Sequence, residues 1–148
     1  MYRPPSLSDQ KERGMKDKTF RVLLVEEEQV LAEITSFRLE LLGYQVHTAG
    51  SAEDAIVHLQ QVEELPHAIV VDLTLPGMNG IDLIERLGSD ERTTKIPVMA
   101  LSHEGDLDAV QNAFIAGASD YLVAPYNPLT LEDKVEELVR RSEIPVSA

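Results

Sequence analysis

Two short stretches of the sequence carry carboxylate side chains immediately after an apolar run. Val22–Val25 leads directly into Glu26–Glu28, and Ala68–Val71 leads directly into Asp72. Acids in such positions could begin a helix, because each carboxylate near a helix N-terminus contributes about 0.3–1 kcal/mol through the macrodipole. They could instead supply oxygen ligands to a cation. The choice depends on whether the fold brings the two stretches together.

The apolar pattern alternates between short strand-like runs and stretches with helical spacing. The strand-like runs are residues 21–25, 44–49, 68–71, 97–101 and 121–123, and the helical stretches are residues 30–41, 52–59, 81–87, 107–114 and 131–138. In the first helical stretch the apolar residues stand at i, i+4, i+7 and i+11: Val30, Ile34, Phe37 and Leu41. Ser51 is expected to cap the second. Such alternation predicts a parallel sheet covered by helices on both faces.

Five repeats of strand and helix predict an α/β fold, the flavodoxin-like (βα)5 three-layer sandwich with a five-stranded parallel sheet in the order 2-1-3-4-5. In that order the first and third strands are neighbours, and ligands bind at their carboxyl ends. The acids after residues 22–25 and Asp72 would therefore meet in one crevice. Like charges gathered there cost several kcal/mol unless one is protonated or a cation neutralises them, which favours the cation site.

Composition and charge restrict the remaining possibilities. The chain has 148 residues, no cysteine and a net charge of −13, of which residues 1–18 carry +2 and the rest −15. We expect a flexible leader at 1–18, one domain at 19–141 and a tail or linker at 142–148. An acidic body of this kind repels nucleic acid and anionic membranes. Without an apolar signal peptide or a membrane-length segment, a cytoplasmic location is expected.

The stretch "AIVVDLTLPGMNGIDLI" at residues 68–84, supported by "VLLVEEEQ", "IPVMALS" and "GASDYLVAP", resembles the receiver domain of response regulators. The resemblance covers roughly residues 20–140. Within the family, the chain is similar to the chemotaxis regulator, which is the simplest member. It implies a two-component signalling protein, not an enzyme, in which an aspartate accepts a phosphoryl group. The donor would be a histidine kinase or a phosphotransfer protein, and a downstream effector protein would read the result.

The resemblance also implies roles for individual residues. Asp72 matches the phosphoacceptor, Ser102 the hydroxyl that hydrogen-bonds the phosphoryl group, and Tyr121 the switch aromatic that turns inward. Glu26 and Glu27 match the acids that hold Mg²⁺ together with Asp72, and no further cofactor is implied. Each residue also has a structural reading: the aspartate could cap a turn, the serine could belong to a strand-end turn, and the tyrosine could pack at the sheet edge.

Two positions depart from the family pattern. Ala124 stands where the family has a lysine that pairs with the phosphoryl group, and the loss of such a partner costs about 3–4 kcal/mol of barrier. Lys95, before the fourth strand, is expected at the opposite end of the sheet. The acid pair is Glu-Glu where most members have aspartates, and Mg²⁺ tolerates altered geometry poorly. Pro125 matches the family position that has a cis peptide bond.

Three functions remain in competition. The first is a phosphorylated receiver that signals through residues 107–114, 121–123 and 131–138, a face through which it could also form a homodimer. The second is a degenerate, phosphorylation-independent receiver that acts as a docking or dimerisation module, which the departures at Ala124 and Glu27 favour. The third, an enzyme on the same fold such as a flavin protein or phosphatase, has the least support, since its motifs are missing.

Overall fold

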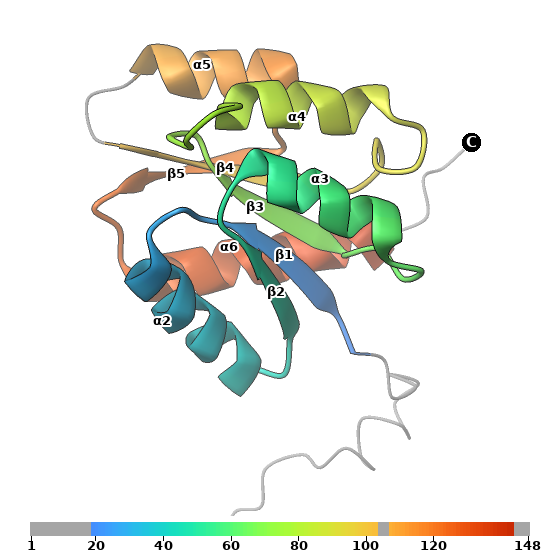
Figure 1. Ribbon diagram of the computed structural model, residues 1–148. Helices are drawn as coiled ribbons and strands as arrows, with labels where there is room; N and C mark the ends of the chain where they lie inside the picture. The colour runs from blue at the N-terminus through green and yellow to red at the C-terminus, as the bar shows by residue number, and fades with distance from the viewer. Residues whose placement is uncertain (1–18, 104–106, 144–148) are drawn as a thin grey trace, which may run out of the picture.

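The computed structural model describes residues 19–103 and 107–143, and within these ranges the chain forms a single five-stranded parallel sheet. The strands are β1 (Arg21–Val25), β2 (Gln45–Ala49), β3 (Ala68–Asp72), β4 (Val98–His103) and β5 (Asp120–Ala124). Their order is β2-β1-β3-β4-β5 and every neighbouring pair is parallel (Figure 1). This confirms the predicted flavodoxin-like topology.

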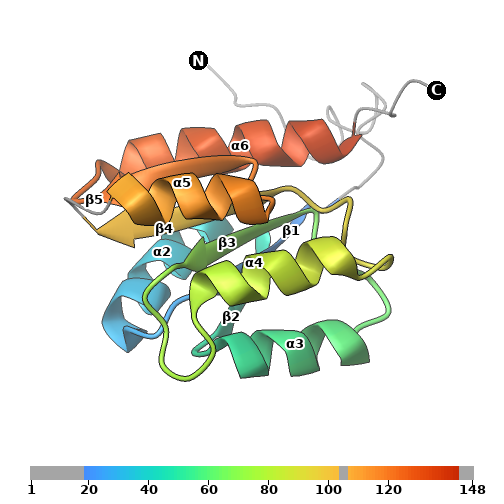
Figure 2. The ribbon, with the colours of Figure 1, turned by 90° about the horizontal axis from the view of Figure 1, so that it is seen from above.

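Helices cover both faces of the sheet. They are α2 (Gln29–Leu41), α3 (Ala52–Gln61), α4 (Gly80–Ser89), α5 (Leu107–Ala116) and α6 (Pro128–Glu143). Figure 2 shows α2 and α6 on one side of the sheet and α3, α4 and α5 on the other. The leader predicted at 1–18 and most of the tail predicted at 142–148 lie outside the described residues, although α6 reaches residue 143. Within the described part of the chain, none of the helices has the length and apolarity to cross a bilayer.

The core consists of two apolar layers, one on each side of the sheet. Successive side chains of a strand point to opposite faces, so Leu23 and Val25 contribute to the α3–α5 layer, while Val22 and Leu24 contribute to the α2–α6 layer. All five residues of β3 are buried, as expected for a central strand covered on both faces. The residue at the end of β3 is therefore held by a rigid element.

Two helices that border the carboxyl edge of the sheet have side-chain caps. The Ser51 hydroxyl accepts a hydrogen bond from the Asp54 amide at 3.0 Å, which confirms the predicted cap of α3. The Asn79 side chain accepts one from the Asp82 amide at 2.9 Å at the start of α4. Such caps satisfy amides that have no partner within the helix and contribute about 1 kcal/mol each.

The first helix differs from the sequence expectation in the face that it buries. The spacing of Val30, Ile34, Phe37 and Leu41 correctly predicts a helix, but these four side chains are more than half exposed. The helix packs on the sheet through smaller residues and one leucine, namely Ala32, Thr35 and Leu39. Periodicity locates an apolar stripe on a helix, but it does not identify the surface that covers the stripe.

Candidate functional site

Three polar side chains are buried together at the carboxyl edge of the sheet. Glu26 follows β1, Asp72 ends β3, and Ser102 lies in β4, with exposed fractions of 6%, 8% and 3%. Because β1 and β4 both pair with β3, parallel register brings these residues, 30 to 76 positions apart in the sequence, to one edge. The fold thus brings together two of the three predicted metal ligands and the predicted phosphate-binding hydroxyl.

Asp72 is held by the turn that follows its strand. Its Oδ1 accepts a hydrogen bond from the Thr74 amide at 2.9 Å. The chain then folds back so closely that a Cβ added at Gly80 would lie 2.5 Å from the Asp72 carbonyl oxygen. Only glycine allows this approach, and the Gly80 amide donates to the Leu73 carbonyl at 3.1 Å. The Thr74 amide therefore positions the carboxyl group of Asp72, and the close approach of Gly80 fixes the backbone that carries it.

Glu26 is the most perturbed ionisable group at this edge. The pKa of its carboxyl group is raised from 4.5 to about 7, chiefly by burial and in smaller part by a hydrogen bond with the Asp72 side chain and by repulsion from that carboxylate. The Glu28 amide donates to Glu26 Oε2 at 3.1 Å, which opposes the rise in pKa. At neutral pH the pair therefore exists partly as a carboxylic acid hydrogen-bonded to a carboxylate, which partly relieves the repulsion expected from the sequence.

The other two glutamates of the triplet occupy different environments. Glu27 and Glu28 are exposed, and Glu28 takes the N-cap position of α2. Among residues 19–103 and 107–143 there is no group of three or more acidic, histidine or cysteine side chains placed to hold a metal ion. The structure thus buries Glu26, but not Glu27, beside Asp72.

Ser102 and Tyr121, predicted to be the phosphate-binding hydroxyl and the switch aromatic, lie on the paired strands β4 and β5. The Ser102 hydroxyl is buried and has no hydrogen-bond partner among residues 19–103 and 107–143. It lies within β4, which continues to His103, so the residue is not in a strand-end turn. A buried hydroxyl without a partner is uncommon and calls for a ligand or an explanation. Tyr121 is 39% exposed and packs edge-to-face on Phe114, with ring centroids 5.6 Å apart.

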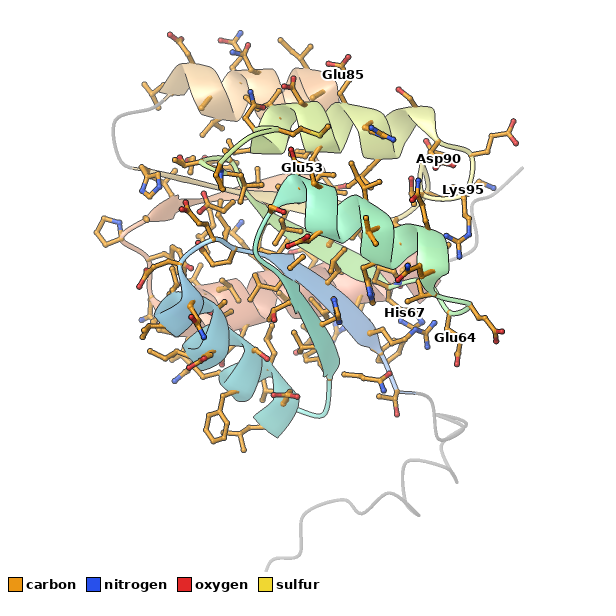
Figure 3. All side chains as sticks on the ribbon, in the orientation of Figure 1. Glu53, Glu64, His67, Glu85, Asp90 and Lys95 are labelled. Carbon is orange, nitrogen blue, oxygen red and sulfur yellow. The ribbon has the colours of Figure 1, made fainter. Side chains whose placement is uncertain are left out.

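Residues 123–127, at the end of β5 and directly after it, include no lysine or arginine that could pair with the acids. Ala124 pairs in register with His103 of β4, and the Ala124–Pro125 peptide bond is cis, as the sequence predicted. Lys95 lies before β4, and Figure 3 shows it at the opposite end of the sheet from the edge where the strands end. It therefore does not replace the absent lysine. Tyr126, two residues after Ala124, is half-buried near the acids, and burial and the charges of Glu26 and Asp72 raise the pKa of its phenol.

The family model of the response regulator receiver domain matches residues 22–136. The chain belongs to the response-regulator receiver family. The matched range contains β2 to β5 and all of β1 except Arg21. It also contains Glu26, Asp72 and Ser102, which we call the acidic edge. This match confirms the family that the sequence motifs indicated. The buried acids and the Ser102 hydroxyl all lie within the receiver domain.

Known proteins similar to this receiver domain agree with the assignment. This chain is 31% identical over 123 residues to the phosphate regulon transcriptional regulatory protein PhoB of Rhizobium meliloti, and the match covers 83% of this chain and 53% of that protein. It is 34% identical over 131 residues to the DNA-binding dual master transcriptional regulator RpaA of Synechocystis, covering 86% and 53%. The chain thus spans about half the length of these relatives.

Solved structures show the same fold over nearly their whole length. A putative response regulator from Chloroflexus aurantiacus superposes with a TM-score of 0.78 at 32% identity, covering 83% of this chain and 99% of that one. The signal receiver domain of a signal transduction histidine kinase from Syntrophus aciditrophicus superposes with a TM-score of 0.79 at 26% identity, covering 88% and 97%. A putative response regulator and a receiver domain of a histidine kinase therefore both resemble this chain.

One residue that sequence reasoning missed holds the loop of the receiver domain between β3 and α4. The Glu53 carboxylate accepts a hydrogen bond from the Met78 amide at 3.0 Å, and this bond lowers the pKa of Glu53. It lies against Gly77, whose φ of +69° favours glycine. Figure 3 shows Glu53 at the start of α3, facing this loop. Because 25 residues separate Glu53 from Met78, no local pattern reveals the contact.

Proposed function

We propose that this receiver domain accepts a phosphoryl group on Asp72 from a phosphohistidine of a histidine kinase or phosphotransfer protein. The proposal rests on one observation: the fixed, buried carboxylate of Asp72 and the buried hydroxyl of Ser102, which has no partner among the described residues, lie at the same edge of the sheet. A carboxylate held in place is a competent nucleophile for phosphoryl transfer. A hydroxyl without a partner is available to donate to a phosphoryl oxygen.

In the proposed step an oxygen of the Asp72 carboxylate forms a bond to phosphorus while the phosphorus–nitrogen bond of the donor breaks. The bonding electrons leave with the imidazole of the donor, which is left neutral because its other ring nitrogen carries a proton. In-line transfer of this kind depends mainly on positioning and on neutralising charge. The Thr74 amide, which donates to Oδ1 of Asp72, holds the nucleophile, and the Ser102 hydroxyl would move to donate to the acyl phosphate.

We propose Mg²⁺ as the ion that neutralises charge at this site. Mg²⁺ is held by one or two carboxylates, with waters and substrate phosphate oxygens completing its octahedron. Glu26 and Asp72 fit that requirement, since their carboxyl groups are hydrogen-bonded to each other. Glu27, the third predicted ligand, would have to turn inward from an exposed position. When bound, the ion would offset the charge that develops on the phosphoryl oxygens.

The output is proposed to pass through the face formed by α5, β5 and α6 to an effector protein. Tyr121 on this face is partly exposed and packs on Phe114 of α5, so an inward turn of its ring would change the surface of both elements. Lys134 of α6 forms an ion pair at 3.0 Å with Asp120, the residue before Tyr121. A turn of the Tyr121 ring would therefore also alter the surroundings of this ion pair. An effector that contacts this face could therefore distinguish the two states.

A second candidate function is a receiver that docks or dimerises without phosphorylation. Specific observations favour it: Ala124 provides no ammonium group, and Glu26, with a pKa of about 7, can be neutralised by a proton without a cation. A site that is stable in this form does not depend on Mg²⁺. In this case the acidic edge would be a structural remnant, and the surfaces of the domain alone would carry the function.

Incubation of the purified chain with Mg²⁺ and either acetyl phosphate or beryllofluoride separates the two functions. The phosphorylation function predicts an adduct in intact-mass spectra that is absent in Asp72→Asn, and shifted NMR signals from Tyr121 under beryllofluoride. Ser102→Ala is expected to weaken the response to beryllofluoride without unfolding the domain. If saturating beryllofluoride leaves every signal of the acidic edge unchanged, the docking function is the correct one.

A further inference from the structure

A stripe of large apolar side chains on α2 has no partner within the described part of the chain. Val30, Ile34, Phe37 and Leu41 are 61%, 53%, 60% and 70% exposed, and Leu42, at the helix end, is 58% exposed. We call these five residues the α2 stripe. In Figure 1 the helix lies on the outer side of the sheet, away from α3, α4 and α5. The opposite side of the same helix is already buried, so α2 is apolar on both sides.

The stripe is large for an exposed surface. Five side chains of this size, each more than half exposed, amount to roughly 400 Å² of apolar area, a size at which exposed patches on monomers are often functional. The stripe continues into an apolar groove of about 250 Å³ between α2 and α6. Ile34 belongs to both, and Tyr126, Pro128 and Leu131 line the far side of the groove. One continuous apolar surface thus runs from α2 to the start of α6.

The spacing of the stripe identifies the kind of partner. The four members within the helix, Val30, Ile34, Phe37 and Leu41, are separated by four, three and four residues, which is the a/d spacing of a coiled-coil seam. A seam of this kind pairs well with an identical seam across a two-fold axis, because each side chain meets its own copy. With flanking side chains included, two copies would bury about 1,000 Å² in total, the lower bound for a specific interface.

The charges beside the seam select a parallel arrangement. With Val30 and Phe37 at d positions, Glu33 takes a g position and Arg38 the following e position. In a parallel pair the g residue of one helix faces that e residue of the other, so Glu33 of one copy meets Arg38 of its partner. Arg38 already pairs with Glu132 through Nε, and its guanidinium group has further donors for a second carboxylate. In an antiparallel pair, Glu33 would face a second glutamate, Glu40.

We propose that a second copy of this chain covers the α2 stripe, in a two-fold dimer with parallel α2 helices. The face formed by α5, β5 and α6 is the other candidate for self-association, and it also exposes Leu107 and Ile115. Its two most exposed apolar residues, however, stand eight positions apart, which is not an a/d interval, and Tyr121 is already packed on Phe114. The dimer through α2 leaves that face open to an effector.

Sedimentation equilibrium of the full chain, from about 1 μM to about 1 mM, tests the proposal. We expect a reversible dimer that Ile34→Glu abolishes over the whole range. The matched control is Ile115→Glu, which places the same charge on an exposed isoleucine of α5 and is expected to leave the dimer unchanged. Far-UV circular dichroism of both variants verifies folding. A chain that is monomeric at every concentration, or a dimer lost only in Ile115→Glu, overturns the proposal.

Cross-linking tests the parallel arrangement independently, because the chain contains no cysteine. In the parallel dimer Val30→Cys meets its own copy, at a separation suited to a disulfide, and oxidation is expected to give a covalent dimer. In an antiparallel dimer Val30 would instead lie near Leu41 of the partner. A cross-link that forms only when Val30→Cys and Leu41→Cys chains are mixed would refute the proposed geometry.

Discussion

The buried pair of Glu26 and Asp72 makes the stability of the domain depend on pH in a direction opposite to that of most carboxylates. Folding raises the pKa of Glu26 from 4.5 to about 7, chiefly through burial and then through Asp72. Below pH 4.5 Glu26 is protonated in both states and carries no penalty. As the pH rises from 4.5 through 7, the unfolded chain releases the proton first, so this contribution to stability is lost. Above pH 7 the loss is complete.

The substitution Glu26→Gln removes this ionisation while retaining the shape of the side chain. A pKa that rises from 4.5 to about 7 corresponds to about 3 kcal/mol at about pH 8. We therefore expect the variant to be more stable than the wild type by up to about 3 kcal/mol at about pH 8, and nearly equal to it at about pH 4.5. Urea unfolding followed by circular dichroism, with a chelator present, measures the difference at each pH.

Two further measurements connect this result with the buried pair. Glu27→Gln removes a neighbouring charge from an exposed side chain, so its effect is expected to stay within about 0.5 kcal/mol at every pH. Addition of Mg²⁺ at about pH 8 is expected to stabilise the wild type more than Glu26→Gln, because the ion replaces the proton between the carboxylates. A stability difference between Glu26→Gln and wild type that does not change with pH would refute the reasoning.

Three other substitutions test the surroundings of the acidic edge. Ala124→Lys is expected to speed phosphorylation by acetyl phosphate about 100-fold, measured as the rate of adduct formation, because it restores a cation worth about 3 kcal/mol. Glu53→Ala is expected to speed hydrogen exchange at the Met78 amide, which loses its acceptor, while exchange in β1 stays unchanged. Gly80→Ala is expected to destabilise the domain by about 1–3 kcal/mol in urea unfolding, since its Cβ would overlap a backbone carbonyl, whereas Gly88→Ala in the same helix, with nothing nearer than 3.8 Å, should not destabilise it.

The sequence alone was sufficient to predict the topology and the place of the acidic edge. Alternation of strands and helices restricts a parallel sheet to a few topologies, because crossovers are right-handed and connections short. The carboxyl ends of the first and third strands then meet, whatever the details of packing. For this reason the sequence alone predicts that Glu26 and Asp72 lie close together. The motif at residues 68–84 independently indicates the family.

Only the tertiary structure decided which acidic side chain is buried beside Asp72 and which face of α2 is buried. Glu26 is buried beside Asp72 while Glu27 is exposed, because adjacent residues point in different directions as the chain leaves the strand. The bond from Met78 to Glu53 joins residues that the sequence separates by 25 positions. Periodicity records that α2 has an apolar stripe, but the side that packs on the sheet depends on the space between helix and strands. That space is filled by Ala32, Thr35 and Leu39, and it leaves the larger side chains for a partner.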